Sequence, residues 1–172
     1  MTKKFQFTSW VYRDITVYSP NEVDRMVDCG LTLPMVPSFN YKDPEHVEML
    51  KGWLERASAR GVKLILDVQI DIPPELYEGD QSWVEEIRNF YRVTLNSHPA
   101  VYGFTVGDEP ITFYELALTK YKIIKLKEAL PELTPYMTCL DNSTNFSISS
   151  EINSRSASIS VSEANSEIFS IT

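Results

Sequence analysis

Short apolar runs alternate with longer amphipathic stretches through the first 140 residues of the chain. Runs rich in β-branched and aromatic residues are typical of strands, and apolar positions spaced three and four apart are typical of helices. The pattern predicts strands at Phe5–Trp10, Leu31–Val36, Val62–Val68, Val101–Gly107 and Thr134–Leu140. It predicts helices at Pro20–Cys29, Pro44–Arg60, Trp83–Ser97 and Phe113–Leu130.

The expected helices carry recognisable start and stop signals. Three of them begin with a capping box, in which a Ser or Thr side chain accepts from a first-turn amide and a Glu three positions on reaches back. The pairs are Ser19 with Glu22, Ser82 with Glu85, and Thr112 with Glu115. The other helix starts at Asp43-Pro44, and Gly30 and Gly61 follow helix ends, where a left-handed residue is favoured.

The order of these elements is βαβαβαβαβ, which indicates parallel strands joined by crossover helices. A doubly wound dinucleotide-binding fold needs a glycine-rich turn after its first strand, and residues 9–14 contain no glycine. A (β/α)8 barrel carries its functional residues at the carboxyl ends of its strands, and each strand expected here is followed by polar or aromatic residues. We therefore predict the α/β class and a partial TIM (β/α)8 barrel of about four βα units plus a fifth strand.

Length and composition together predict two parts in this chain. A complete barrel takes about 250 residues, whereas this chain has 172. We expect an incomplete barrel domain over residues 1–140 and a weakly structured, Ser/Asn-rich tail over residues 141–172. A tail of that composition buries too little apolar surface to offset the entropy of ordering it. The open edges of an incomplete barrel favour self-association or instability.

Charge and composition narrow the function classes. Sixteen basic and twenty-four acidic side chains give a net charge of −8, which argues against nucleic acid as a partner because such binding relies on Lys and Arg. No apolar run is long enough to span a bilayer and no signal peptide is visible, so a cytoplasmic location is the default expectation, with secretion of a longer parent protein left open. Cys29 and Cys139 lie far apart in the sequence and suggest neither a disulfide framework nor a zinc site. No metal and no cofactor is expected.

Carboxylates and aromatic residues gather after the expected strands. This combination suits a polyol, because carboxylates bind hydroxyl groups and aromatic rings stack on the C–H faces of sugars. We expect a carbohydrate substrate as the partner. The candidate substrate-binding residues are Trp10, Tyr12 and Arg13 after the first strand, Asp67 and Gln69 after the third, and Asp108 after the fourth.

The most distinctive element is the end of the fourth strand, Gly107-Asp108-Glu109-Pro110. It resembles the acid/base strand of the clan A glycoside hydrolases, (β/α)8-barrel enzymes in which this strand typically ends Asn-Glu-Pro. The resemblance covers the N-terminal portion of such a barrel, from Phe5 to Leu140. It implies a glycoside hydrolase-like activity in which Glu109, as general acid/base, protonates the leaving oxygen and then activates water.

The chain departs from that family in two places. Asp108 stands where the family has Asn, so it accepts but does not donate a hydrogen bond when ionised. The family's nucleophile, a Glu at the end of the seventh strand, has no counterpart that the sequence places. We therefore expect the chain as given to lack turnover. The sugar, the linkage and the stereochemical outcome stay open.

Two other function classes fit the same residues. One is a carbohydrate-binding or scaffold barrel that keeps the strand-end residues without catalysis. The other is a metal-assisted lyase or isomerase, in which Asp67, Asp71 and Asp108 would hold a divalent cation.

Overall fold

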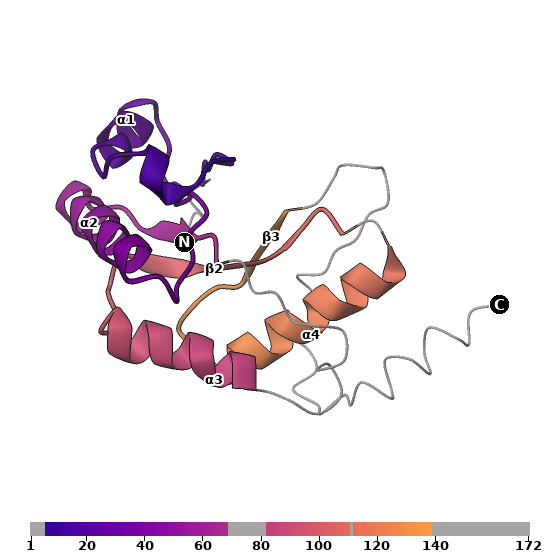
Figure 1. Ribbon diagram of the computed structural model, residues 1–172. Helices are drawn as coiled ribbons and strands as arrows, with labels where there is room; N and C mark the ends of the chain where they lie inside the picture. The colour runs from indigo at the N-terminus through magenta and orange to yellow at the C-terminus, as the bar shows by residue number, and fades with distance from the viewer. Residues whose placement is uncertain (1–5, 69–81, 111, 139–172) are drawn as a thin grey trace, which may run out of the picture.

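The computed structural model of the protein describes residues 6–68, 82–110 and 112–138 (Figure 1). From residue 44 onward, helices and short parallel strands alternate, as the hydrophobic pattern predicts. In chain order the elements are a 3-10 turn η1 (Ile15–Val17), α1 (Glu22–Asp28), α2 (Pro44–Arg60), β1 (Leu64–Leu66), α3 (Ser82–Asn89), a π-helical turn η3 (Phe90–Thr94), β2 (Val101–Asp108), α4 (Phe113–Ala129) and β3 (Tyr136–Thr138).

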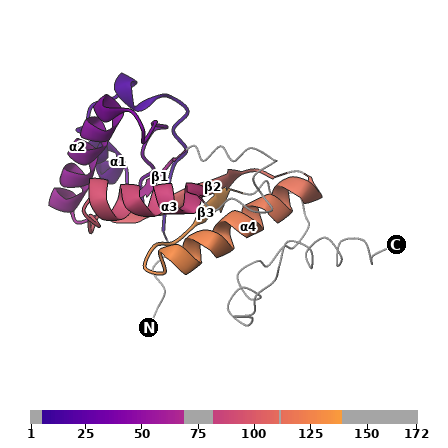
Figure 2. The ribbon, with the colours of Figure 1, turned by 60° about the horizontal axis from the view of Figure 1, so that its bottom comes forward.

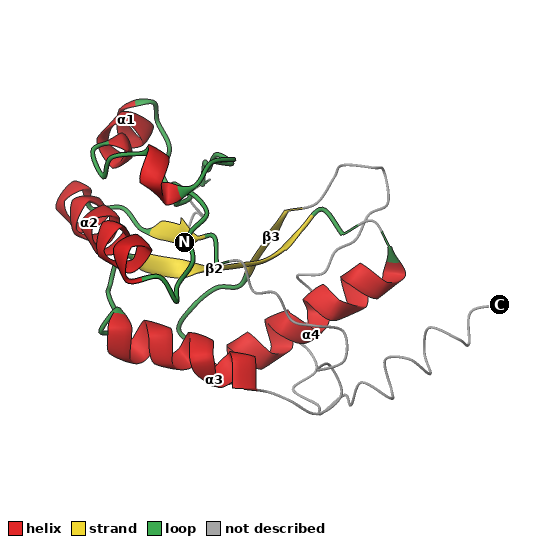
Figure 3. Ribbon diagram, viewed as in Figure 1, coloured by secondary structure: helices red, strands yellow, loops and turns green. Residues whose placement is uncertain are grey.

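The three strands, yellow in Figure 3, form one parallel sheet in the order β1-β2-β3. Leu66 of β1 lies beside Phe104 of β2, and Thr105 of β2 lies beside Tyr136 of β3. This arrangement confirms the predicted α/β class and the parallel pairing of the third, fourth and fifth predicted strands.

The prediction of the first two strands is wrong, although both segments still run beside the sheet. Residues 6–10 and 31–36 form no strand. Isolated parallel bridges link Asp14 to Ser38, Met35 to Ile65 and Phe39 to Val68. The amide of Ile65 donates to the Pro34 carbonyl at 3.0 Å, but Pro34 has no amide of its own to extend the ladder toward the preceding residues. Pro34 and Pro37 thus limit the ladder along this segment.

The parallel segments nevertheless lie side by side in sequence order. The amides of Thr32 and Leu33 both donate to the Phe7 carbonyl at 3.0 Å, and the Val36 amide donates to the Ile65 carbonyl at 2.9 Å. The N-terminal segment therefore neighbours the second segment, and the second neighbours β1. Together with β1, β2 and β3, these two segments make five parallel segments that lie side by side in chain order.

Helices cover one face of the sheet with a large apolar core. In Figures 1 and 2, α3 and α4 run along the same side of β2 and β3. The apolar sides of α2 and α3 are buried against the sheet. Their residues are Val47, Leu50, Trp53, Leu54 and Ala57 on α2 and Trp83, Val84 and Ile87 on α3. These side chains pack with Leu64, Leu66 and Phe104 of the strands. We call this side the helix face.

The opposite side of the sheet, which we call the inner face, carries a separate small cluster. Leu33, Met35 and Ile65 form its buried centre, and the partly buried rings of Trp10, Tyr102 and Tyr136 pack against it. No helix residue belongs to this cluster in the part of the chain that the structure describes. Successive strand residues point to opposite faces, so Ile65 is inner while its neighbours Leu64 and Leu66 face the helices.

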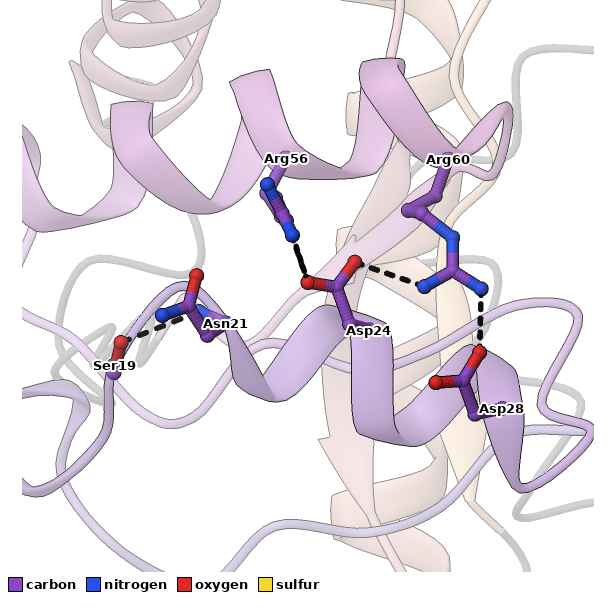
Figure 4. Close-up of polar contacts among 6 residues, drawn as sticks. All are labelled: Ser19, Asn21, Asp24, Asp28, Arg56 and Arg60. Atoms are coloured by element: carbon purple, nitrogen blue, oxygen red, sulfur yellow. Dashed lines mark hydrogen bonds and ion pairs between the residues drawn. The ribbon is translucent and has the colours of Figure 1, made fainter.

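Paired charges hold α1 against α2 (Figure 4). Arg56 donates through Nε to Asp24 at 2.7 Å, and Arg60 donates to Asp24 at 2.9 Å and to Asp28 at 2.7 Å. These guanidinium hydrogen bonds lower the pKa of the Asp24 carboxyl below its ordinary value. Asp24 is half-buried and its arginine partners lie partly in solvent, so the contribution of these pairs falls as the salt concentration rises.

The helix-end signals are confirmed at α2 and α4 and wrong at α1. Thr112 and Glu115 form both hydrogen bonds of the capping box, and Asp43 caps α2 through the Glu45 amide at 2.9 Å. At α1 the predicted Ser19 box does not form, because the helix starts later, at Glu22, and Ser19 accepts from the nearby Asn21 amide instead.

Gly30 and Gly61 have left-handed φ angles of 94° and 65°, as expected after helix ends. The predicted tail, residues 141–172, and the end of the last predicted strand lie outside the described residues. Within the described ranges, no helix has the length and apolar character needed to cross a membrane.

Candidate functional site at the strand ends

A row of polar side chains crosses the inner face toward the carboxyl ends of the strands. Asp67 stands between Leu66 and Val68, which both belong to the helix-facing core, so its own side chain takes the inner face. Thr105 stands in the same way between Phe104 and Val106. The alternation that builds the core therefore also turns these two polar residues inward.

The strand registers place the members of this row beside one another. The pairing of Phe39 with Val68 sets Ser38 beside Asp67, and the pairing of Leu66 with Phe104 sets Asp67 beside Thr105. Thr105 in turn lies beside Tyr136. We call Ser38, Asp67, Thr105 and Tyr136 the polar row.

Asp67 is the buried carboxyl group of this row, with 8% of its surface exposed. The Ser38 hydroxyl donates a short hydrogen bond to Asp67 Oδ2. Burial raises the pKa of the Asp67 carboxyl above its ordinary value, the Ser38 hydrogen bond opposes the shift, and the negative charge of Asp108 adds to it. The strand registers set these two carboxyl groups on the same face of neighbouring segments.

The raised pKa of Asp67 predicts a pH-dependent stability. Because folding favours the protonated acid, its contribution is complete below the unfolded pKa of 3.8 and is lost as the pH rises through the folded value. Asp67→Asn removes the charge and leaves an oxygen for the Ser38 hydroxyl. We expect this variant to gain stability relative to wild type as the pH rises above about 4, as measured by denaturant unfolding at a series of pH values. A constant difference between the two proteins would contradict the assignment.

Thr105 is the second buried member of the row, with 6% of its surface exposed. Its Oγ1 atom is buried and has no hydrogen-bond partner in the described part of the chain. A buried hydroxyl without a partner is costly, and native proteins seldom leave one so. The atom is therefore a candidate ligand-binding group.

A bulge in β2 brings Asp108 onto the same face. The β2–β3 register shifts between Thr105 and Gly107, so Gly107 lies beside Met137 and Asp108 beside Thr138. A Cβ atom at Gly107 would lie 2.7 Å from Thr119 Oγ1 on α4, which shows that Gly107 faces the helices. The next residue, Asp108, is thereby turned inward, one level beyond Thr105.

Thr138 fixes the end of β2 through three hydrogen bonds. Its Oγ1 atom donates to Asp108 Oδ1 at 2.5 Å. The Glu109 amide donates to the same Oγ1 and to the Thr138 carbonyl, both at 3.2 Å. These bonds hold Asp108 and the Glu109 backbone at the strand end.

Glu109 has a left-handed backbone with a φ angle of 43°, a conformation that is costly for a residue with a side chain. Its side chain is exposed. Strain of this kind concentrates at functional sites, where the surrounding structure holds it in place. Glu109 thus stands at the carboxyl end of β2, accessible and fixed at its amide.

The aromatic candidates lie on the N-terminal segment. Trp10 packs against the inner-face cluster, while Tyr12 is 87% exposed, and their ring centres are 6.0 Å apart. Arg13 is exposed beside them in sequence. Gln69 and Asp71 lie outside the described residues.

Sequence reasoning missed a second polar cluster, around His46 at the start of α2. The Asn40 amide donates to His46 Nδ1 at 3.0 Å, so the ring carries its proton on Nε2, which faces Asp14 at 3.7 Å and Asp43 at 3.9 Å. Two hydrogen bonds from Thr16 are the main cause that lowers the pKa of Asp14. The cluster ties the end of the N-terminal segment to α2.

The structure thus brings Asp67, Asp108 and Glu109 to one edge of the sheet and adds Ser38, Thr105 and Thr138, which the strand pattern alone did not distinguish from ordinary strand residues. Within the described ranges, no group of three or more His, Cys, Asp or Glu side chains could hold a metal ion. No protein-family model matches the chain, and no curated protein matches its sequence. The fold and site therefore define a parallel α/β protein with an acidic strand-end site.

Proposed function

We propose that this chain forms the N-terminal portion of a glycoside hydrolase-like (β/α)8 barrel, with Glu109 as general acid/base. The main support is the order of the parallel segments. They neighbour one another in chain order, with helices on one face and a separate cluster on the other. A barrel has this order, whereas a doubly wound sheet reverses its strand order at a switch point.

The chemistry assigned to Glu109 follows from its position and accessibility. An exposed carboxyl at a strand end can protonate the leaving oxygen of a glycoside and then take a proton from water. The hydrogen bonds from its amide to Thr138 hold the residue in one place. The polar row beside it offers oxygen atoms to sugar hydroxyl groups, and Trp10 and Tyr12 offer ring faces.

The experiment is a hydrolysis screen of the polypeptide encoded by the whole reading frame that contains this chain, against a panel of nitrophenyl glycosides. We expect release of nitrophenol from at least one member, because cleavage of the bond between the sugar and the nitrophenyl group releases a coloured product. Sugar binding is measured in parallel by ligand-observed NMR. Binding together with turnover supports the proposal, and the absence of both contradicts it.

A carbohydrate-binding barrel without turnover is the second candidate. Retaining hydrolysis needs a second carboxyl group about 5–5.5 Å from the first, and in the clan A enzymes it stands on the seventh strand. The described part of the chain holds five parallel segments, and the partly buried ring of Trp10 beside the exposed ring of Tyr12 at the first of them suits sugar binding. Binding without turnover in the same screen would favour this candidate.

A further inference from the structure

Three oxygen atoms on the inner face have no hydrogen-bond partner within the described ranges. The first is Thr105 Oγ1, which is buried. The other two are Asp67 Oδ1 and Asp108 Oδ2. Among the described residues, Asp67 accepts a hydrogen bond at Oδ2, from Ser38, and Asp108 accepts one at Oδ1, from Thr138. Asp67 and Thr105 lie side by side, and Asp108 lies one level further along β2. The three atoms come from two neighbouring strands and share one face.

Among the described residues, the carboxylates of Asp67 and Asp108 have no positively charged partner. Neither Asp67 nor Asp108 takes part in an ion pair with a described Lys, Arg or His side chain. Asp67 is buried, with 8% of its surface exposed. Asp67 is buried while Asp108 is exposed to solvent, so the charge that most favours a positively charged ligand is that of Asp67.

The number and kind of these three oxygen atoms favour an ammonium group over a metal ion. An ammonium group has three N–H donors and no acceptor, so it matches three acceptor oxygens. A hard metal ion such as Ca²⁺ takes six to eight oxygen ligands, and no group of three or more metal-binding side chains is found among the described residues. A neutral hydroxyl would use a single donor and leave both carboxylate charges unbalanced.

We infer that Asp67, Thr105 and Asp108 bind the ammonium group of an amino sugar, so that the substrate class is a glycoside whose ring carries a free amine. This inference rests on the proposed function for the sugar and deepens it. The net charge of −8 adds a favourable field for a polymer of such sugars, which is a polycation.

The test compares three oligosaccharides of equal length that differ at one ring position: an oligomer of glucosamine, of glucose and of N-acetylglucosamine. Binding to the whole 172-residue chain is measured calorimetrically at about pH 6, where a primary amine is charged. We expect the glucosamine oligomer to bind at least about tenfold more tightly than the glucose oligomer, because hydrogen bonds to charged groups are the strong ones. The N-acetylglucosamine oligomer, which has no charge, should bind no better than the glucose oligomer.

Three variants separate the site from general attraction to an acidic surface. Asp108→Asn and Thr105→Val should each lower the preference for the amine at least about threefold, while Glu55→Gln, which removes a charge from the exposed face of α2, should leave it unchanged. Melting curves confirm that each variant is folded. The inference is overturned by equal binding of the amino and hydroxyl oligomers, by no binding of either, or by an equal loss in all three variants. This experiment measures binding alone, and turnover is measured separately in the product of the whole reading frame. Amine selectivity here with no turnover in that product would reject the hydrolase and keep the site.

Discussion

Replacement of Glu109 by glutamine is expected to lower the rate of hydrolysis of glycosides with poor leaving groups by at least about 100-fold. Glutamine keeps the size and hydrogen-bonding reach of the side chain but carries no transferable proton. The backbone should not change, because the Glu109 amide, rather than its side chain, makes the hydrogen bonds to Thr138. The loss is therefore chemical and is measured as kcat/KM in the active reading-frame product.

Leaving groups of different basicity make this result diagnostic. A nitrophenolate departs without protonation, so the bond-cleavage step for nitrophenyl glycosides should be affected much less than that for alkyl glycosides or oligosaccharides. Glu55→Gln, an exposed change on α2, serves as the matched control and should leave both rates unchanged. Equal loss on both substrate types would show that Glu109 positions the substrate, and unchanged rates would remove it from the mechanism.

Replacement of Gly103 by alanine is expected to destabilise the fold by about 3 kcal/mol or more, the upper part of the range for overpacking. A Cβ atom at this position would lie 1.7 Å from the Thr134 carbonyl oxygen and 2.6 Å from its carbonyl carbon. These are backbone atoms of the segment that leads into β3, and the Thr134 amide is itself bonded to the Tyr102 carbonyl at 3.0 Å. Relief of the clash must separate β3 from β2.

Gly52→Ala is the matched control for that substitution. A Cβ atom at Gly52 on α2 would meet the Pro20 ring at 3.1 Å, a side chain that can shift, and alanine favours the helix by about 1 kcal/mol. Denaturant unfolding should therefore show a large loss for Gly103→Ala and little change or a gain for Gly52→Ala. Equal stability of Gly103→Ala and wild type would mean that β2 and β3 do not approach as closely as described.

The separation of β3 from β2 links this stability prediction to the site. Asp108 and the Glu109 amide depend on Thr138 of β3 for their hydrogen bonds. A variant that loosens β3 should therefore also lose the fixed position of both acidic residues. The contact between Gly103 and Thr134 and the candidate site thus both depend on the packing of β3 against β2.

Several elements could be predicted from the sequence because their signals are local. Asp43 and Pro44 start α2, Gly61 ends it, and Thr112 with Glu115 starts α4, each through hydrogen bonds or backbone angles within a few residues. The third and fourth strands were found because continuous apolar runs need burial on both faces. The first two predicted strands failed because a regular ladder depends on pairing with distant segments, and in the second of them Pro34 and Pro37 lack the amides that would extend the ladder.

The candidate site was predictable only in part. Asp67, Asp108 and Glu109 stand out because acidic residues directly follow apolar strands. Ser38, Thr105 and Thr138 gave no such signal, because a hydroxyl residue in a strand is common and its role depends on which face it takes and what lies beside it.

The sequence by itself determined the chain order of helices and parallel segments, the helix ends, and the acidic character of the strand ends, since each follows from residues close together in the chain. Only the tertiary structure decided which of these acidic groups meet. The shift in register between Thr105 and Gly107 turns Asp108 to the inner face, and the pairing of three segments sets Ser38, Asp67 and Thr105 in one row. Register depends on packing between distant segments, and a shift of one residue would send each of these side chains to the opposite face.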